Sequence, residues 1–288
     1  MNWTERRERF RAILSGGRCV HPASVFDPIS ARIAEDLGFE VGMFAGSTAS
    51  LTVLGAPDII LLTLSEFAGQ AYRICRAGNL PLLVDADHGY GNALNVKRAV
   101  EELETAGVAG LSIEDTELPQ AFGTAGSARL TSIEEGTGKM RAALAGRQDP
   151  RLVIAGRTSA PRVTGIEDTI ARARAYVAAG VDAIFIVGVN TRKELEAVSA
   201  EVKIPIILGG SGPELMDPAY LAGRGVRVAL QGHQPFMAAV QAVYSTLKAL
   251  REGTPPNQLG NIASGALMKR VTRDADYERW SREFQGGA

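Results

Sequence analysis

Acidic side chains follow two neighbouring apolar runs of the sequence, at the point where each run ends. Asp85 and Asp87 come after one run, and Glu114 and Asp115 come after the next. Asp58 lies in the segment that follows an earlier run. Carboxylates held close together repel each other, and a hard divalent cation relieves this repulsion. Oxygen ligands are typical of Mg²⁺, with Mn²⁺ as the alternative. Each acid alone also fits a helix cap or a turn, but the paired spacing favours a metal site.

Arg157 and His233 stand at the ends of two further apolar runs. A buried arginine needs an anionic partner, so Arg157 either forms an ion pair with the acidic cluster or holds a substrate anion. For His233, a structural role and a substrate contact both remain open. Gly46 and Ser47 follow another run. Their backbone N–H groups and hydroxyl suit an anion, although a tight turn explains the same residues.

Eight short apolar runs alternate with amphipathic stretches along the chain. Because these runs are almost continuously apolar, they are typical of parallel strands buried on both faces. The predicted strands are 20–25, 41–45, 81–84, 110–113, 152–155, 183–187, 204–208 and 226–230. The helical patterns between them are 30–37, 64–76, 93–106, 132–144, 166–179, 192–200 and 235–251. Eight such units predict an α/β fold, a (β/α)₈ TIM barrel. An open doubly wound sheet is the alternative, disfavoured because eight strands without an antiparallel edge would make a large open sheet.

Five glycines stand where a helical pattern gives way to the next strand. They are Gly38, Gly78, Gly107, Gly180 and Gly225. Helices often end in a residue with left-handed backbone, and glycine adopts it without steric cost. We therefore expect each of these glycines to end a helix in that conformation.

The two ends of the chain extend beyond the barrel pattern. Residues 4–14 predict an extra N-terminal helix over the bottom of the barrel. Residues 254–257 read Thr-Pro-Pro-Asn, which is typical of a linker. The sequence therefore divides into a barrel at 1–253 and a tail at 254–288. The tail carries aromatic side chains, and we expect it to be partly helical and to pack on its own barrel or on a neighbouring subunit.

Charge and composition exclude several classes of protein. Lys and Arg total 31 and Asp and Glu total 32, so no basic surface for nucleic acid or an anionic membrane is expected. Two cysteines are too few for a disulfide scaffold or a Cys-rich metal site. The N-terminal residues lack the apolar core of a signal peptide, and no apolar run approaches the ~20 residues of a membrane span. We expect a cytoplasmic protein whose partners are small molecules.

The ordered motifs resemble the isocitrate lyase/phosphoenolpyruvate mutase superfamily, and within it most of all the bacterial oxaloacetate decarboxylase group. The similarity covers most of the predicted barrel, and the segments that carry it are 24–32, 45–47, 85–92, 113–116 and 155–158. The resemblance implies a Mg²⁺-dependent barrel that acts on small-molecule α-keto acids. It also implies a homotetramer, a dimer of dimers, with a helix exchanged between subunits.

The resemblance further implies a role for each candidate side chain. Asp85 matches the direct metal ligand. The acids that match groups holding the metal's waters are Asp58, Asp87 and Glu114. The residues that match substrate contacts are Ser47, Arg157 and His233, with the Gly46 amide beside Ser47. In this hypothesis Arg157 and the two amides stabilise the charge that grows on the substrate's keto oxygen, and His233 holds a carboxylate.

The segment after the fourth strand separates the branches of this superfamily. C–C lyases carry a Lys-Cys-Gly-His type motif there and the phosphonate branch carries Lys and Asn, whereas residues 118–123 read Leu-Pro-Gln-Ala-Phe-Gly. Decarboxylation needs less, because stabilising an enolate suffices. We therefore expect Mg²⁺-dependent decarboxylation of oxaloacetate to pyruvate and CO₂ through a metal-stabilised enolate. The alternative is a C–C or C–P bond lyase on a related 2-hydroxy or keto acid, of the methylisocitrate lyase or phosphonopyruvate type. A non-catalytic keto-acid binder is the third interpretation.

Two segments depart from the pattern of the oxaloacetate decarboxylase group. Ser159 stands where relatives commonly have Asn, and the loop 209–212 lacks an aromatic residue. Both are predicted at the substrate-facing rim, so the identity of the keto acid is less constrained than the class of reaction.

Overall fold

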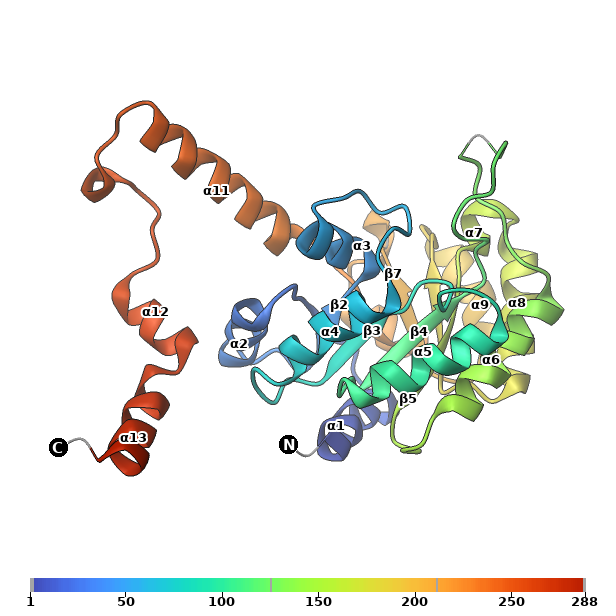
Figure 1. The fold of residues 1–288 in the computed structure, drawn as a ribbon. Coiled ribbons are helices and arrows are strands. Elements are labelled where there is room, and N and C mark those ends of the chain that lie inside the picture. Colours follow the sequence, from blue (N-terminus) through green and yellow to red (C-terminus); the bar gives the residue numbers. More distant parts are fainter. Residues whose placement is uncertain (1–2, 125, 211, 287–288) are drawn as a thin grey trace. The chain divides into compact units, whose positions relative to one another are not determined.

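The computed structural model describes residues 3–124, 126–210 and 212–286 of the chain. The chain folds as two compact units, Met1–His233 and Gln234–Ala288, and the first holds all the strands (Figure 1). This division falls one helix earlier than the predicted boundary after Gly253.

The first unit contains eight parallel strands, all of which the apolar runs predicted. They are β1 (Ala23–Ser24), β2 (Gly42–Phe44), β3 (Leu82–Asp85), β4 (Gly110–Glu114), β5 (Val153–Thr158), β6 (Ala183–Val187), β7 (Ile206–Gly209) and β8 (Val226–Ala229). Each strand pairs with the next one along the chain. Four strands, β3, β4, β5 and β7, extend past their predicted ends. In the first three of them Asp85, Glu114 and Arg157 therefore lie within the hydrogen-bonded ladder, which fixes their backbones.

Hydrogen bonds join β8 to the chain segment before β1. Val20 and Val228 form a parallel bridge. The Val20 N–H donates to the Arg227 carbonyl at 2.9 Å, and the Ala229 N–H donates to the Val20 carbonyl at 3.0 Å. The sheet is therefore closed as a TIM barrel, and the alternative of an open doubly wound sheet is wrong.

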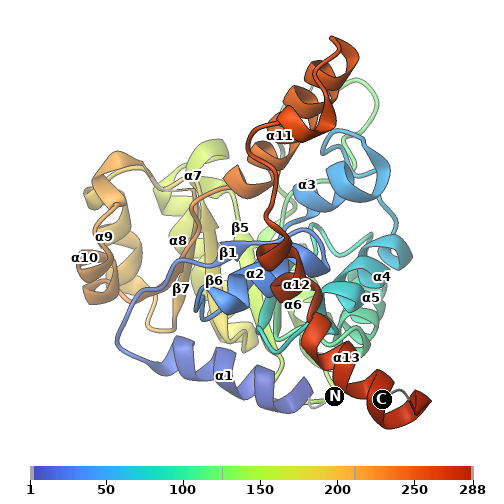
Figure 2. The same ribbon diagram turned by 90° about the vertical axis from the view of Figure 1, so that its left-hand side faces the viewer.

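Helices follow the strands and form the outer layer of the first unit (Figure 2). They are α1 (Trp3–Ser15), α2 (Pro28–Asp36), α3 (Gly46–Ala49), the π-helix η1 (Ser50–Leu54), α4 (Leu64–Cys75), α5 (Ala93–Thr105), α6 (Ile133–Gly146), α7 (Ala160–Val163), α8 (Ile166–Ala179), α9 (Arg192–Glu201), the 3₁₀ turn η2 (Pro213–Leu215) and α10 (Pro218–Gly223). Reciprocal side-chain caps begin α4 at Thr63 and α5 at Asn92. Local polar residues therefore set where these helices start.

Four of the five glycines predicted to end helices do adopt left-handed backbone, with φ between 80° and 101°: Gly38, Gly107, Gly180 and Gly225. The prediction was wrong for Gly78. There the Glu35 carboxylate accepts hydrogen bonds from the Asn79 N–H at 3.0 and 3.1 Å. A Cβ on Gly78 would lie 1.9 Å from a Glu35 oxygen, so this glycine makes room for a carboxylate rather than for a turn of the backbone.

Helix α1 covers the N-terminal end of the barrel, as predicted, and runs beneath the strands in Figure 2. Phe10 is fully buried and packs with inward-facing strand residues such as Val153 and Leu83. A second apolar layer lies between the strands and the outer helices. With its bottom filled in this way, the barrel presents functional groups at the opposite end, where the strands have their carboxyl termini.

The second unit is helical, as predicted for the tail. Its elements are α11 (Gln234–Arg251), the 3₁₀ turn η3 (Pro256–Gln258), α12 (Gly265–Thr272) and α13 (Asp274–Gln285). None of the described residues of α11 is buried within this chain. Within the described ranges, no helix combines the length and apolar character that crossing a membrane requires.

Candidate active site

A cavity of about 330 Å³ lies at the carboxyl ends of the strands. It is lined by seven of the eight candidate residues: Ser47, Asp58, Asp85, Asp87, Glu114, Arg157 and His233. Gly46, the eighth, lies directly behind the cavity wall. A Cβ on Gly46 would come within 2.5 Å of the Asp87 carboxylate, so a glycine is needed for Asp87 to sit there. The fold thus brings together residues from five different strand ends.

Arg157 forms ion pairs with two of the acids. Its Nη1 donates to Asp85 Oδ2, and its Nη2 lies 3.2 Å from Glu114 Oε2. Glu114 and Arg157 are direct partners in the β4–β5 ladder, which places their side chains together. The guanidinium also lies 5.4 Å from the centre of the Phe185 ring. The two alternatives for Arg157 are therefore not exclusive, because its ion pairs engage two of its three nitrogens and leave the N–H donor of the third available.

That donor is Arg157 Nε, which is buried and has no hydrogen-bond partner among the described residues. A buried donor without a partner costs on the order of 1–3 kcal/mol. Such a cost is expected where an incoming ligand supplies the missing acceptor. The atom belongs to a residue that lines the cavity, so an anionic substrate is the natural partner.

Asp85 is held from two further directions. Ser112 Oγ donates to Asp85 Oδ1 at 3.1 Å, and the Asp87 N–H donates to the same oxygen at 3.3 Å. Ser112 lies beside Asp85 in the β3–β4 ladder and two residues before Glu114, on the same face of β4. These contacts orient the Asp85 carboxylate within the cavity.

The electrostatics of the cavity are those of crowded carboxylates. Burial, together with the charges of Asp85 and Glu114, raises the pKa of Asp87 well above its usual value. Burial raises the pKa of Glu114 to about 6, against the opposing effect of Arg157. Burial and the charge of Asp85 raise the pKa of Asp58 as well. The site therefore favours a bound cation, which would offset the repulsion.

His233 closes the cavity on the side of β8. Its Nδ1 is hydrogen-bonded to Ser24 Oγ at 2.8 Å. Burial lowers the pKa of His233, although Asp85 and Asp58 oppose this shift. A neutral imidazole fixed through Nδ1 leaves Nε2 as the atom that can contact a substrate.

The donor set fits a divalent metal ion held partly through water. Four carboxylates share one cavity, and carboxylate oxygens suit Mg²⁺. In the described part of the chain, no three His, Cys, Asp or Glu side chains gather tightly enough to hold an ion alone. Mg²⁺ commonly keeps several waters and takes only one or two carboxylates directly, so a Mg²⁺ site does not require a tight cluster of protein ligands.

Asp115 does not join the rim, contrary to expectation. Neighbouring residues on a strand point to opposite faces, so Glu114 faces the cavity and Asp115 faces the helices. Asp115 is fully buried, where Tyr176 donates to it at 2.6 Å and Arg172 at 3.1 Å. His88 is also buried and lies outside the cavity lining, and burial lowers its pKa to about 4.

Sequence reasoning missed several residues of the site, among them Ser24, Ser112 and Phe185. Period-two alternation could have found Ser112, because it stands two residues before Glu114. No local signal marks Ser24 or Phe185, since each acts on a residue far away in the sequence. Of the departures from the family pattern, Ser159 lies outside the cavity lining and Gly209 lies within it; Ser211 lies outside the described residues.

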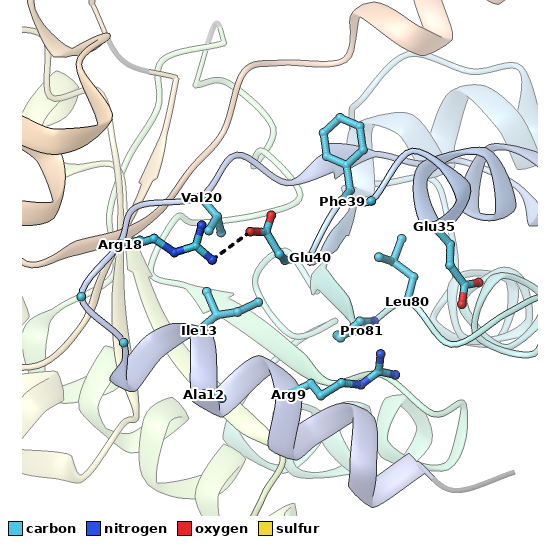
Figure 3. Close-up of a pocket in the computed structure, with 13 residues that line it drawn as sticks. Arg9, Ala12, Ile13, Arg18, Val20, Glu35, Phe39, Glu40, Leu80 and Pro81 are labelled. Atoms are coloured by element: carbon cyan, nitrogen blue, oxygen red, sulfur yellow. Dashed lines mark hydrogen bonds and ion pairs between the residues drawn. The ribbon is translucent and has the colours of Figure 1, made fainter.

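Another cavity, of about 510 Å³, lies at the N-terminal end of the barrel against α1 (Figure 3). Its wall includes Arg18 and Glu40, which form an ion pair at 3.2 Å, and apolar residues such as Ile13 and Leu80. The carboxylates described above are at the opposite end. Functional groups of barrel enzymes gather at the carboxyl ends of strands, so the smaller cavity is the candidate active site.

The chain is similar to several known proteins. The family model for phosphoenolpyruvate phosphomutase matches residues 10–251. An oxaloacetate decarboxylase of Bradyrhizobium diazoefficiens is 62% identical over 96% of both chains. A solved oxaloacetate acetylhydrolase with the inhibitor 3,3-difluorooxaloacetate has a TM-score of 0.86 at 26% identity, covering 99% of this chain and 98% of that one. A phosphonopyruvate hydrolase solved with oxalate and Mg²⁺ has a TM-score of 0.87 at 27% identity, covering 97% and 99%.

The match covers the whole barrel, and a relative at 62% identity spans nearly the full chain. The protein belongs to the phosphoenolpyruvate phosphomutase family.

Proposed function

We propose that this protein decarboxylates oxaloacetate to pyruvate and CO₂ with a bound Mg²⁺, for which Mn²⁺ can substitute. The observation that carries the proposal is the cavity itself, where four carboxylates lie with an arginine whose buried Nε has no hydrogen-bond partner among the described residues. A metal site beside an unsatisfied cationic donor suits a keto acid, which brings both a chelating group and a negative charge. The 62% identity to an oxaloacetate decarboxylase supports the same substrate.

In this proposal Asp85 binds the ion directly, and Asp58, Asp87 and Glu114 hold its waters. When bound, the ion supplies Lewis-acid stabilisation of negative charge on the substrate's oxygens. Breaking the bond to the departing carboxylate moves an electron pair towards the keto oxygen, and the resulting enolate takes a proton from water at C3 to give pyruvate. Preorganised donors aimed at that oxygen lower the barrier, because they interact more strongly with the developing charge than with the neutral carbonyl.

The chain supplies such donors from two sides. Arg157 Nε is one, since its other nitrogens are held by Asp85 and Glu114 and its orientation is therefore fixed. The amides of Gly46 and Ser47 at the start of α3 are the others. His233, fixed by Ser24, contacts a substrate carboxylate through Nε2. None of these roles requires a mobile acid or base, which agrees with a loop at 118–123 that contains neither Cys nor His.

The proposal is tested by measuring pyruvate formation from a small panel of keto and 2-hydroxy acids. We expect turnover of oxaloacetate with Mg²⁺ or Mn²⁺, loss of at least about 100-fold on chelation with EDTA, and recovery on adding the metal back. An enzyme-free reaction with the same metal corrects for spontaneous decarboxylation. Pyruvate released from phosphonopyruvate or 2-methylisocitrate, but not from oxaloacetate, would identify a C–P or C–C lyase instead.

We also propose that the protein assembles as a homotetramer, a dimer of dimers that exchanges a helix between subunits. Helix α11 exposes apolar side chains at helical spacing, namely Met237, Val240, Tyr244 and Leu247. The tail exposes Tyr277, Trp280 and Phe284. Apolar surface of this extent on a soluble chain is typical of an interface.

Truncating the chain after Gly253 is expected to lower the mass measured by light scattering, because the aromatic tail is removed. The point variant Trp280→Ala in the full chain serves as the conservative control and should weaken assembly less. A full-length protein that is monomeric at micromolar concentration would contradict the proposed assembly.

A further inference from the structure

We propose that Arg162 binds the C4 carboxylate of the substrate and selects four-carbon keto dicarboxylates over keto monocarboxylates. This inference rests on the proposed function and names a contact that none of the sequence motifs suggested. Arg162 belongs to the short helix α7 that follows β5, and its side chain lines the same cavity as Arg157 and His233.

The two arginines of the cavity differ in exposure and in their partners. The Arg157 side chain is 16% exposed and its charge is compensated by both Asp85 and Glu114. Arg162 is exposed, and within the described residues it forms no ion pair and no side-chain hydrogen bond. The cavity therefore offers one compensated guanidinium at its floor and one uncompensated guanidinium at its mouth. In the proposed function Arg157 Nε donates to the keto oxygen, so Arg162 is the cationic donor of the cavity that is available to the C4 carboxylate of oxaloacetate.

The Arg162 side chain packs against Gly188, which follows β6. A Cβ on Gly188 would lie 2.4 Å from Arg162 Cγ and 2.8 Å from Arg162 Nε. Gly188 also has φ +101°, a conformation that favours glycine. The arginine stem therefore lies across the end of β6 in a place that only a glycine leaves open. This packing directs the side chain to the cavity.

Decarboxylation removes the charge of the C4 carboxylate. The bond between C3 and C4 breaks, its electron pair moves towards C3 and the keto oxygen, and C4 leaves as neutral CO₂. A cation beside C4 therefore loses its ionic partner as the reaction proceeds. It stabilises the bound substrate at least as much as the transition state, and such contacts change KM rather than lower kcat. Arg157 differs in this respect, because charge grows beside it.

The test is the kinetics of Arg162→Gln, which keeps the length and polarity of the side chain but removes the charge. We expect KM for oxaloacetate to rise about 10- to 100-fold, the size of a lost charge-assisted hydrogen bond. The value of kcat should stay at or above that of the wild type. The exposed Arg141→Gln on α6, outside the cavity lining, removes the same charge and should change neither constant. An unchanged KM in Arg162→Gln, or a kcat that falls 10-fold or more, would overturn the inference.

A binding measurement separates this inference from the proposed function. The probes are 3,3-difluorooxaloacetate, which has a C4 carboxylate, and oxalate, which is too short to have one. In Arg162→Gln we expect calorimetry with Mg²⁺ to show the dicarboxylate bound about 10- to 100-fold more weakly and oxalate bound nearly as in the wild type. If the wild type fails to turn over oxaloacetate but shows this difference, the proposed function is wrong and the Arg162 contact stands. Equal weakening of both probes would overturn the contact.

The variant Gly188→Ala provides an independent check. Its methyl group should displace the Arg162 stem and raise KM for oxaloacetate. In the Arg162→Gln background the same change should have much less effect, because the contact has already been lost. Fully additive effects would show that Gly188 does not act through Arg162.

Discussion

Replacing Asp85 by alanine is expected to abolish binding of Mg²⁺ and Mn²⁺ as measured by isothermal titration calorimetry, and to abolish turnover of oxaloacetate with it. Asp85 is oriented by Ser112 and by the Asp87 backbone and sits among the other carboxylates of the cavity. Loss of a group that only holds metal-bound water costs about 10- to 100-fold in affinity. We therefore expect a smaller loss for Asp87→Ala, within that range, and a larger loss for Asp85→Ala.

Two controls make the Asp85 result specific. Asp276→Ala removes an acid of the second unit, which pairs with Arg279 at 2.9 Å, and should leave metal affinity unchanged. Thermal unfolding of Asp85→Ala without metal reports whether the fold survives, since Arg157 retains Glu114 as a partner. Wild-type affinity in a folded Asp85→Ala variant would refute the assignment of Asp85 as the direct ligand.

The second large effect is expected for Arg157→Lys. Lysine keeps the positive charge but lacks the planar guanidinium of arginine. In Arg157 the two Nη atoms of that group contact Asp85 and Glu114, and Nε remains available to the substrate. Removal of one preorganised donor to a developing oxyanion typically costs about 10²–10³ in kcat. We expect a loss of this size in oxaloacetate turnover while metal affinity is retained.

Measuring kcat and the thermal midpoint on the same Arg157→Lys protein separates catalysis from stability. Breaking a buried ion pair costs about 3–5 kcal/mol of folding free energy. The matched control is Arg172→Lys, since Arg172 is buried and paired with Asp115 and Asp168 but lies outside the cavity. We expect Arg172→Lys to lower the midpoint without a specific loss of kcat. If Arg157→Lys melts early yet turns over normally when folded, Arg157 serves only to neutralise the acids.

The barrel could be predicted because its determinants are local. A parallel strand covered on both faces must be almost continuously apolar, and each of the eight runs has this apolar pattern. Thr63 and Asn92 cap helices by bonding to residues three positions later in the sequence, so a short stretch of sequence marks where each helix starts. Functional groups of a barrel gather at the carboxyl ends of its strands. The residues at the ends of the apolar runs were therefore sufficient to predict that Asp85, Glu114, Arg157 and His233 share one site, and all four line the same cavity.

What each of these side chains contacts was decided by the tertiary structure alone. Asp115 is adjacent to Glu114 in sequence but faces the helices, because one step along a strand reverses the direction of the side chain. The register between β4 and β5 sets Arg157 beside Glu114. Gly78 was predicted to end a helix, whereas the structure uses it to admit Glu35, a residue from another helix.

The sequence by itself therefore determined which segments of the chain reach the rim of the barrel, since periodicity and strand ends depend on neighbours along the chain. The closed sheet determined how those residues pair. Ser24 meets His233 and Gly188 makes room for Arg162 only after strands distant in sequence are brought side by side. A contact between such residues depends on strand register and on the space that a missing Cβ leaves, and neither is encoded within a single run of the chain.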